Sequence, residues 1–187
     1  DRARIRGRYK IPQNAKVIIG SGRDTYEKNL HLFIDVFTGL KRRDDAWYAF
    51  LIGNCVDSLQ PRINELGFQQ SFFLPGEVEN PFEFYRASDI FFLSSRTEGM
   101  PNALIEALAC GCKAVAMETG GIAYFAKKNP DNGLFIFKQG ELPDNIAQAV
   151  DGLNDRTSST DYRRFIEDYF SPSKQIKKYC ELIGRDE

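Results

Sequence analysis

A chain of 187 residues, 27% charged and 42% hydrophobic, is long enough for one domain with a substantial core, and this composition excludes a disordered or fibrous class. Its 25 basic and 26 acidic residues leave a net charge of -1, so no overall positive field favours nucleic acid. No apolar run approaches the roughly 20 residues that span a bilayer, which predicts no transmembrane segment.

Basic residues alternate with smaller ones at the start of the chain. They are Arg2, Arg4, Arg6, Arg8 and Lys10. We interpret residues 1–15 as a solvated basic lead-in or interdomain linker, in preference to a phosphate-binding or membrane-binding patch. The folded domain is then expected over residues 16–187.

Short apolar runs that end in turn residues alternate with segments of helical periodicity. The runs predict strands at residues 16–22, 46–53, 71–74, 90–93, 113–117 and 133–137. Helices are expected at residues 29–40, 57–66, 81–87, 101–110, directly after 119–121, and at 144–153, 161–169 and 173–183. Such alternation predicts a Rossmann-like α/β domain with three layers and a mostly parallel sheet of about six strands.

The cysteines and the single histidine give no metal-binding pattern. No two of the cysteines form a Cys-x-x-Cys pair, so we interpret them as reduced thiols of a cytoplasmic protein. They are Cys55, Cys110, Cys112 and Cys180. With His31 as the only histidine, we expect neither a zinc site nor another metal site.

The stretch from Ser94 to Gly111 combines a strand end, a polar turn and a helix. Pro101 suits the first helical position and Gly111 the residue just past the helix end. The N–H groups at the helix start would favour an anionic phosphate. They belong to Asn102, Ala103 and Leu104. Two carboxylates, Glu98 and Glu106, bracket this start, and we hypothesise a sugar-nucleotide site here.

The loop after the first predicted strand carries two cations, Arg23 and Lys28. Both lie near the start of the following helix, where they can converge on a diphosphate. A cation at position 28 opposes the helix dipole, and such a local misfit favours a functional role over a purely structural one. The dinucleotide fingerprint is incomplete, because Thr25 stands where its third glycine belongs.

Taken together, these motifs resemble the family 4 glycosyltransferases, which are retaining enzymes of the GT-B fold. The resemblance rests on Glu98-x7-Glu106 and on Gly22-Arg23-x4-Lys28-Asn29, with further matches at residues 74–78, 85–89, 119–121 and 132–134. It covers nearly the whole chain in consistent order. A GT-B enzyme has two Rossmann-like domains, and this chain resembles the C-terminal, donor-binding one.

The resemblance implies a role for each site residue. Arg23 and Lys28 would bind the diphosphate, Glu98 the donor sugar and Glu106 the ribose. The backbone from Gly99 through Met100 to Ala103 would hold sugar and phosphate, and the backbone of Val78 would pack on the base. We count Arg23, Lys28 and Glu98 as the catalytic candidates, with Glu98 positioning sugar hydroxyls in preference to acting as a nucleophile.

The implied donor is a nucleotide-diphosphate sugar, with UDP favoured over GDP and no cofactor required. The acceptor would be a glycan or a lipid-linked glycan, bound through an N-terminal domain that this chain lacks. The resemblance places such an enzyme in the cytoplasm, with peripheral contact at the inner membrane face as an option for the full-length protein. Two alternatives stay open: a non-hydrolysing sugar-nucleotide epimerase, and a non-catalytic nucleotide-binding or docking module.

Overall fold

The structure is a computed structural model that describes residues 1–99, 101–128 and 134–154, together with Ser171, Ser173 and Ile176. Its six strands form one sheet in which every pairing is parallel. They are β1 (Lys16–Ser21), β2 (Trp47–Ile52), β3 (Phe72–Gly76), β4 (Ile90–Leu93), β5 (Lys113–Met117) and β6 (Leu134–Phe137). The expected α/β class and strand number are confirmed.

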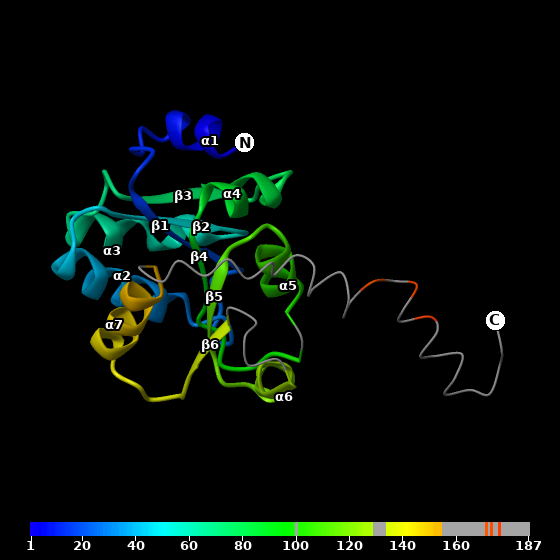
Figure 1. Ribbon diagram of the computed structural model, residues 1–187. Helices are drawn as coiled ribbons and strands as arrows, with labels where there is room; N and C mark the ends of the chain where they lie inside the picture. The colour runs from blue at the N-terminus through cyan, green and yellow to red at the C-terminus, as the bar shows by residue number, and fades with distance from the viewer. Residues whose placement is uncertain (100, 129–133, 155–170, 172, 174–175, 177–187) are drawn as a thin grey trace, which may run out of the picture.

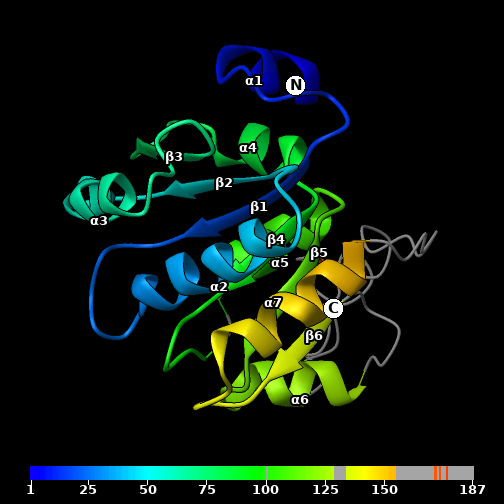
Figure 2. The same ribbon diagram turned by 90° about the vertical axis from the view of Figure 1, so that its left-hand side faces the viewer.

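Helices connect the strands and cover both faces of the sheet (Figures 1 and 2). They are α1 (Arg2–Arg8), α2 (Leu30–Arg43), the 3-10 helix η1 (Val56–Leu59), α3 (Gln60–Glu65), α4 (Pro81–Ala87), α5 (Asn102–Ala109), α6 (Gly120–Lys128) and α7 (Pro143–Asn154). The two helices expected at 161–169 and 173–183 lie outside the described residues, apart from Ser173 and Ile176.

The strand order, β3-β2-β1-β4-β5-β6, reverses its direction of growth between β1 and β4. The central strand β1 is paired on both sides, because Ile18 lies opposite Ala49 of β2 and Ile90 of β4. In open parallel sheets of this kind, ligands bind at the carboxyl ends of the strands where the order reverses. The loops after β1 and β4 therefore define the place to look for a site.

The core consists of two apolar layers, one on each face of the sheet. Adjacent residues of β1 alternate between them: Ile18 packs with α2, α3 and α7, whereas Val17 and Ile19 pack with α1, α4, α5 and α6. Because both faces are covered, the central strands are apolar at consecutive positions, which explains the short unbroken hydrophobic runs. The aromatic rings of Phe92 and Phe137 stack at 5.4 Å within the first layer.

Helix α2 is held on the sheet by an apolar stripe and on α7 by a close approach. Its buried residues recur at intervals of three and four, as the sequence predicted, and the helix runs three residues past the expected end at Leu40. A Cβ built at Gly39 would lie 2.9 Å from the Cβ of Ala147. Helices α2 and α7 can therefore approach this closely because Gly39 has no side chain. Three basic residues in the last turn favour the helix dipole.

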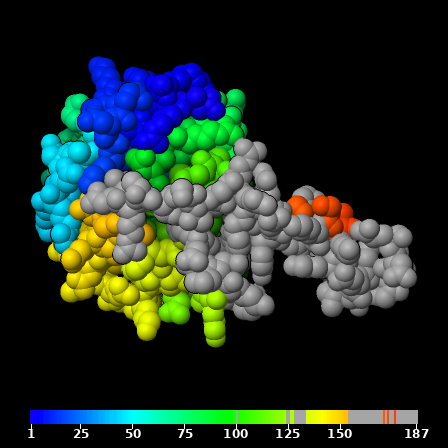
Figure 3. All heavy atoms as spheres, in the orientation of Figure 1, coloured from blue at the N-terminus to red at the C-terminus, as the bar shows by residue number. Residues whose placement is uncertain are grey.

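The N-terminal residues differ from the expected solvated segment. Residues 2–8 form α1, which packs on α4, and the blue N-terminal atoms abut green ones at one end of the molecule (Figure 3). Ile5 and Arg6 are fully buried. Arg6 donates to backbone carbonyls and to Asp89, so its charge is compensated inside the fold. The expectation of a solvated run is wrong here, and a linker to a further domain stays a prediction.

Candidate functional site

Backbone hydrogen bonds join the carboxyl ends of β1, β2 and β3 through three glycines. The N–H of Gly22 donates to the carbonyl of Ile52 at 3.0 Å, and the N–H of Gly53 donates to the carbonyl of Gly76 at 2.8 Å. Gly53 has φ +138°, and a Cβ there would lie 2.0 Å from the carbonyl oxygen of Gly22. Only glycine fits at position 53, and this contact fixes the loop that carries Arg23.

Lys28 and Glu98, predicted as site residues from separate motifs, form an ion pair across the loops after β1 and β4. Lys28 Nζ lies 2.5 Å from Glu98 Oε1, and the Glu98 side chain is only 13% exposed. A Cβ built at Gly22 would lie 3.4 Å from Lys28 Cγ and Cδ, so the lysine stem passes over that glycine. The pair places one cation and one carboxylate at the point where the strand order reverses.

Further bonds tie these two loops together. The buried Ser94 hydroxyl donates to the carbonyl of Lys28 at 2.7 Å. The N–H of Arg96 donates to the carbonyl of Glu27 at 2.7 Å, and Arg96 Nη2 donates to Asn29 Oδ1 at 3.0 Å. Neither Ser94 nor Arg96 was predicted to contribute to the site, because their partners lie more than 60 residues away in the chain.

The start of α5 is one residue later than expected. Pro101 has the extended backbone of an N-cap residue, and α5 begins at Asn102. The N–H of Leu104 already donates to the carbonyl of Pro101 at 3.1 Å, so the prediction that it is free for a ligand is wrong. The N–H groups of Asn102 and Ala103 have no partner among the described residues and remain the donors for an anion.

The far end of α5 follows the predicted glycine stop. Gly111 has φ +90°, its N–H donates to the carbonyl of Leu108, and the next N–H, of Cys112, donates to the carbonyl of Ala107. This pattern is a Schellman motif, in which a left-handed residue ends the helix. Helix α5 is therefore fixed at its C-terminal end, while its N-terminal end faces the loop of Glu98.

Glu106 is half-buried on α5 and lies near the buried Tyr85 of α4. Burial raises the pKa of Tyr85 to about 12; a hydrogen bond with Ser21 opposes this rise and the Glu106 carboxylate adds to it. Glu106 has no hydrogen bond or ion pair with any described residue, so its oxygens are open to a ligand hydroxyl. The three residues link the end of β1 with α4 and α5.

The other predicted site residues make no bond to the Lys28–Glu98 pair among the described residues. Arg23 is exposed and makes no ion pair within the part of the chain that the structure describes. Gly99 is exposed, whereas Met100 lies outside the described residues. Val78 is half-buried and lines a hollow of about 510 Å³ between α1 and the start of α4, with Tyr9 and Phe84 among its neighbours. The structure therefore brings Lys28 and Glu98 together and leaves Arg23 open to solvent.

The start of α6 also faces the Glu98 loop. A Cβ built at Gly120 would lie 3.8 Å from the carbonyl oxygen of Glu98. The preceding Thr119 is buried, and its hydroxyl has no hydrogen-bond partner among the described residues. Residues 119–121 follow β5, the neighbour of β4, and therefore lie at the same carboxyl end of the sheet as the Glu98 loop.

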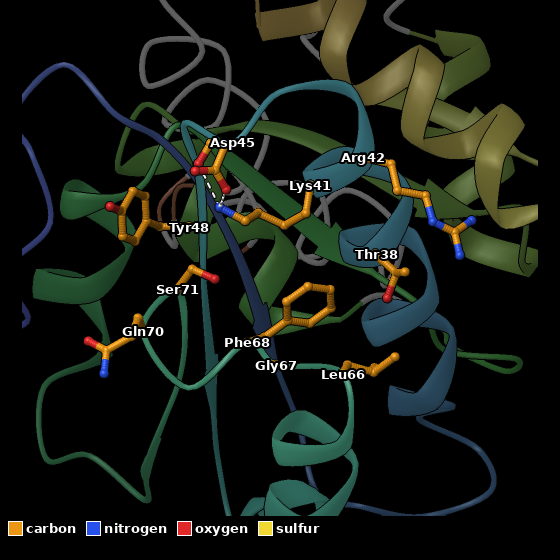
Figure 4. Close-up of a pocket in the computed structure, with 10 residues that line it drawn as sticks. All are labelled: Thr38, Lys41, Arg42, Asp45, Tyr48, Leu66, Gly67, Phe68, Gln70 and Ser71. Atoms are coloured by element: carbon orange, nitrogen blue, oxygen red, sulfur yellow. Dashed lines mark hydrogen bonds and ion pairs between the residues drawn. The ribbon is translucent and has the colours of Figure 1, made fainter.

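A second hollow lies at the amino ends of β2 and β3, opposite the carboxyl ends that carry the candidate site. It has a volume of about 570 Å³ and is lined by α2, the end of α3 and the amino ends of β2 and β3 (Figure 4). Two of its charged groups pair with each other, because Lys41 bonds to Asp45, and Lys41 Nζ lies 5.6 Å from the Tyr48 ring centre. The third, Arg42, lies 4.0 Å from Asp144 of α7. None of the predicted site residues lines it. The candidate site is therefore the group of loops at the carboxyl ends of the strands, where Lys28 and Glu98 meet.

Among the described residues, no group of three or more His, Cys, Asp or Glu side chains is arranged to hold a metal ion. No helix in those same ranges combines the length and hydrophobicity needed to cross a membrane.

A doubly wound parallel sheet, with a cation, a carboxylate and a free helix start at its switch point, defines an α/β domain of the Rossmann type. The sequence then assigns the family. Residues 1–168 match the glycosyl transferases group 1, and the chain belongs to that family.

Characterised relatives agree with this assignment. The chain is 26% identical over 150 residues to the lipopolysaccharide core biosynthesis mannosyltransferase LpsB of Rhizobium meliloti, covering 76% of this chain and 43% of that protein. It is 32% identical over 133 residues to mannosylfructose-phosphate synthase of Agrobacterium fabrum, covering 65% of this chain and 29% of that enzyme. The chain therefore spans less than half the length of these relatives.

Solved structures share the fold over nearly the whole chain. Anabaena Alr3699/HepE in complex with UDP superposes with a TM-score of 0.83 at 19% identity, covering 97% of this chain and 52% of that structure. A glycosyltransferase from Rickettsia africae superposes with a TM-score of 0.80 at 21% identity, covering 98% of this chain and 52% of that structure. The expected architecture, one half of a GT-B fold, is confirmed.

Proposed function

We propose that this chain is the donor-binding half of a retaining glycosyltransferase that transfers a sugar from a nucleotide diphosphate to a hydroxyl acceptor. The observation that carries the proposal is the Lys28–Glu98 pair beside the free start of α5, at the switch point of the sheet. A cation and free N–H groups suit a diphosphate, and a carboxylate suits sugar hydroxyls.

In this proposal the departing diphosphate is stabilised by Lys28, Arg23 and the N–H groups of Asn102 and Ala103. These are fixed donors aimed at the charge that develops as the bond to the sugar breaks. The proposal requires no metal ion, because cationic side chains and the helix start supply the positive potential. A donor that reaches Lys28 also displaces it from Glu98, which frees the carboxylate for the sugar.

Glu106 and Val78 would complete the donor site. Glu106 is half-buried without a protein partner among the described residues, so it can accept hydrogen bonds from ribose hydroxyls. The Val78 backbone would pack on the base, and Gly99 and Met100 would contribute to the sugar site. UDP is the proposed nucleotide, and the UDP complexes of Anabaena Alr3699/HepE support that choice at the level of the shared fold.

The remainder of the reaction belongs to the rest of a longer protein. Solved structures with this fold are about twice as long, which supports a further N-terminal domain that binds a glycan or lipid-linked acceptor. We place the whole enzyme in the cytoplasm, working on acceptors at the inner membrane face. The isolated chain should then bind a donor without transferring its sugar.

Calorimetric titration of UDP, GDP and ADP tests the proposal. We expect the chain to bind UDP, and Lys28→Met to weaken that binding by about 1.5–3 kcal/mol, or roughly 10- to 150-fold in Kd, with uridine binding unchanged. Arg23→Ala should act in the same direction. Arg42→Ala is the matched control, because Arg42 is exposed beside the hollow at the amino ends of β2 and β3. Absence of binding for all three nucleotides contradicts the proposal.

A further inference from the structure

We propose that Arg96 is a positioning residue that holds Lys28 in place for the diphosphate of the donor. The inference rests on the proposed donor-binding function and assigns a role to a side chain outside the predicted set. Arg96 lies two residues before Glu98, in the loop that follows β4. It does not contact the donor in this proposal and acts through the turn that carries Lys28.

Three consecutive residues of that turn are bonded to the β4 loop. The carbonyl of Glu27 accepts from the Arg96 N–H at 2.7 Å, and the carbonyl of Lys28 accepts from the Ser94 hydroxyl at 2.7 Å. The side chain of Asn29 accepts from Arg96 Nη2 at 3.0 Å. Lys28 is thus fixed before, at and after its own Cα, and its ammonium group is directed to Glu98.

Asn29 shows that the turn depends on Arg96. Asn29 precedes α2 and has φ +49°, in the left-handed region, yet its side chain makes no capping hydrogen bond to the helix. Asparagine before a helix ordinarily accepts from the first free N–H groups. Here its amide oxygen is held by Arg96 instead, so the α2 cap is given up in favour of a bond between the two loops.

The Arg96 side chain is held on a second side by Tyr26. The guanidinium carbon lies 4.7 Å from the Tyr26 ring centre, although that tyrosine is 76% exposed. Arg96 Nε is buried and has no partner among the described residues. A buried N–H without a hydrogen-bond partner costs stability, and an exposed aromatic ring contributes little to it. Such local misfits tend to mark functional sites.

These contacts hold the turn of Lys28 in place before the donor binds. A lysine whose backbone turn is already fixed loses less freedom when it binds a phosphate than one on a mobile turn does, and only its ammonium group has to move from Glu98 to the phosphate. Removing Arg96 should release Asn29 to cap α2 and let the Lys28 turn relax. We expect Arg96→Ala to weaken UDP binding about 5- to 10-fold, with little change for UMP, because Lys28 acts on the diphosphate.

The test is a double-mutant cycle measured by calorimetry with UDP and UMP. Arg96→Ala should weaken UDP binding in the otherwise unchanged chain and have no further effect in Lys28→Met, because Arg96 acts through Lys28. Tyr26→Ala, a change at an exposed position, should show the same pattern more weakly, and Tyr26→Phe should retain full affinity. Arg62→Ala is the matched control, since Arg62 also joins α2 to a neighbouring helix, through Asp35.

The outcomes separate this inference from the proposed function. If the unchanged chain binds no UDP, the proposed function fails. If it binds UDP but Arg96→Ala and Tyr26→Ala bind equally well, the positioning role is wrong. The role is also wrong if Arg96→Ala weakens UDP binding by the same factor with and without Lys28, or weakens UMP binding as much as UDP binding. Thermal melts of every variant establish that the compared chains are folded.

Discussion

Arg6 offers the sharpest test of how the N-terminal residues belong to the domain. Its side chain is fully buried and donates to the carbonyls of Ala87 at 2.9 Å, Gln13 at 2.9 Å and Ala15 at 2.8 Å. It also pairs with Asp89 at 3.0 Å. Burial lowers the pKa of Arg6, whereas the Asp89 carboxylate raises it, so the charge is tolerated because that partner is present.

We predict that Arg6→Met destabilises the chain by about 3–5 kcal/mol. Methionine fills much of the volume but cannot donate, so the buried carbonyls lose their partner, and one such orphaned group costs about 1–3 kcal/mol. Asp89 keeps its bonds to Arg2 and to the Val17 N–H, which limits the loss. The estimate agrees with the usual cost of removing one member of a buried ion pair. It is a large share of the roughly 5–15 kcal/mol that stabilises a typical domain.

Urea unfolding, followed by circular dichroism, measures this change. Arg4→Met is the matched control, because Arg4 lies on the same helix, is 53% exposed and pairs with Glu83 at the surface. We expect less than about 1 kcal/mol for that variant. If Arg6→Met also lost less than about 1 kcal/mol, the buried role of Arg6 and the docking of α1 would be contradicted.

Three other changes give distinct expectations. Glu98→Gln should tighten UDP binding about fivefold at low salt, because Lys28 is then free to meet the diphosphate; calorimetry that shows weaker binding contradicts this. Gly53→Ala should lower the free energy of unfolding by about 2–3 kcal/mol in urea, because its Cβ meets the Gly22 carbonyl and its φ is positive. The raised pKa of Tyr85, about 12 in the folded chain, means that stability present below pH 10 is lost as the pH rises towards 12. Between pH 9 and pH 11.5 the unchanged chain should therefore lose about 2 kcal/mol of stability relative to Tyr85→Phe, and a difference that does not change with pH would refute this.

Much of the fold was predictable because its signals are local. The continuous apolar runs of β1 and β4 follow from a sheet that is covered on both faces, and the stripe of α2 follows from its single buried side. Gly111 marks the end of α5 because its positive φ favours glycine. These features depend on neighbours in sequence, and the structure confirms them.

Arg6 shows where such reasoning fails. In sequence it is one of five alternating cations, a pattern typical of a solvated segment. Its burial depends on carbonyls at residues 12–15 and 87 and on Asp89, which come together only when α1 docks on α4. No local periodicity reveals a buried charge whose partners are distant in the chain.

In the candidate site, too, the residues of local motifs were predicted, whereas contacts between distant loops were not. Lys28 and Glu98 were predicted from the loops that carry them, but their direct pairing depends on two loops 70 residues apart. Arg96 gave no sequence signal, because its contacts with Tyr26 and Asn29 exist only in the folded chain. The N–H of Leu104 is engaged by a bond to the carbonyl of Pro101, three residues earlier, a tightening of the first turn that the sequence does not reveal.

The location of donor binding is the central claim, and two-dimensional NMR of the chain with added UDP tests it most directly. We predict that the largest amide shift changes fall at residues 22–29 and 94–103, with smaller ones near Val78 and Glu106. The residues around the hollow at Lys41 and Ser71 should not change. Changes concentrated at that hollow, or no changes at all at saturating UDP, would contradict the account.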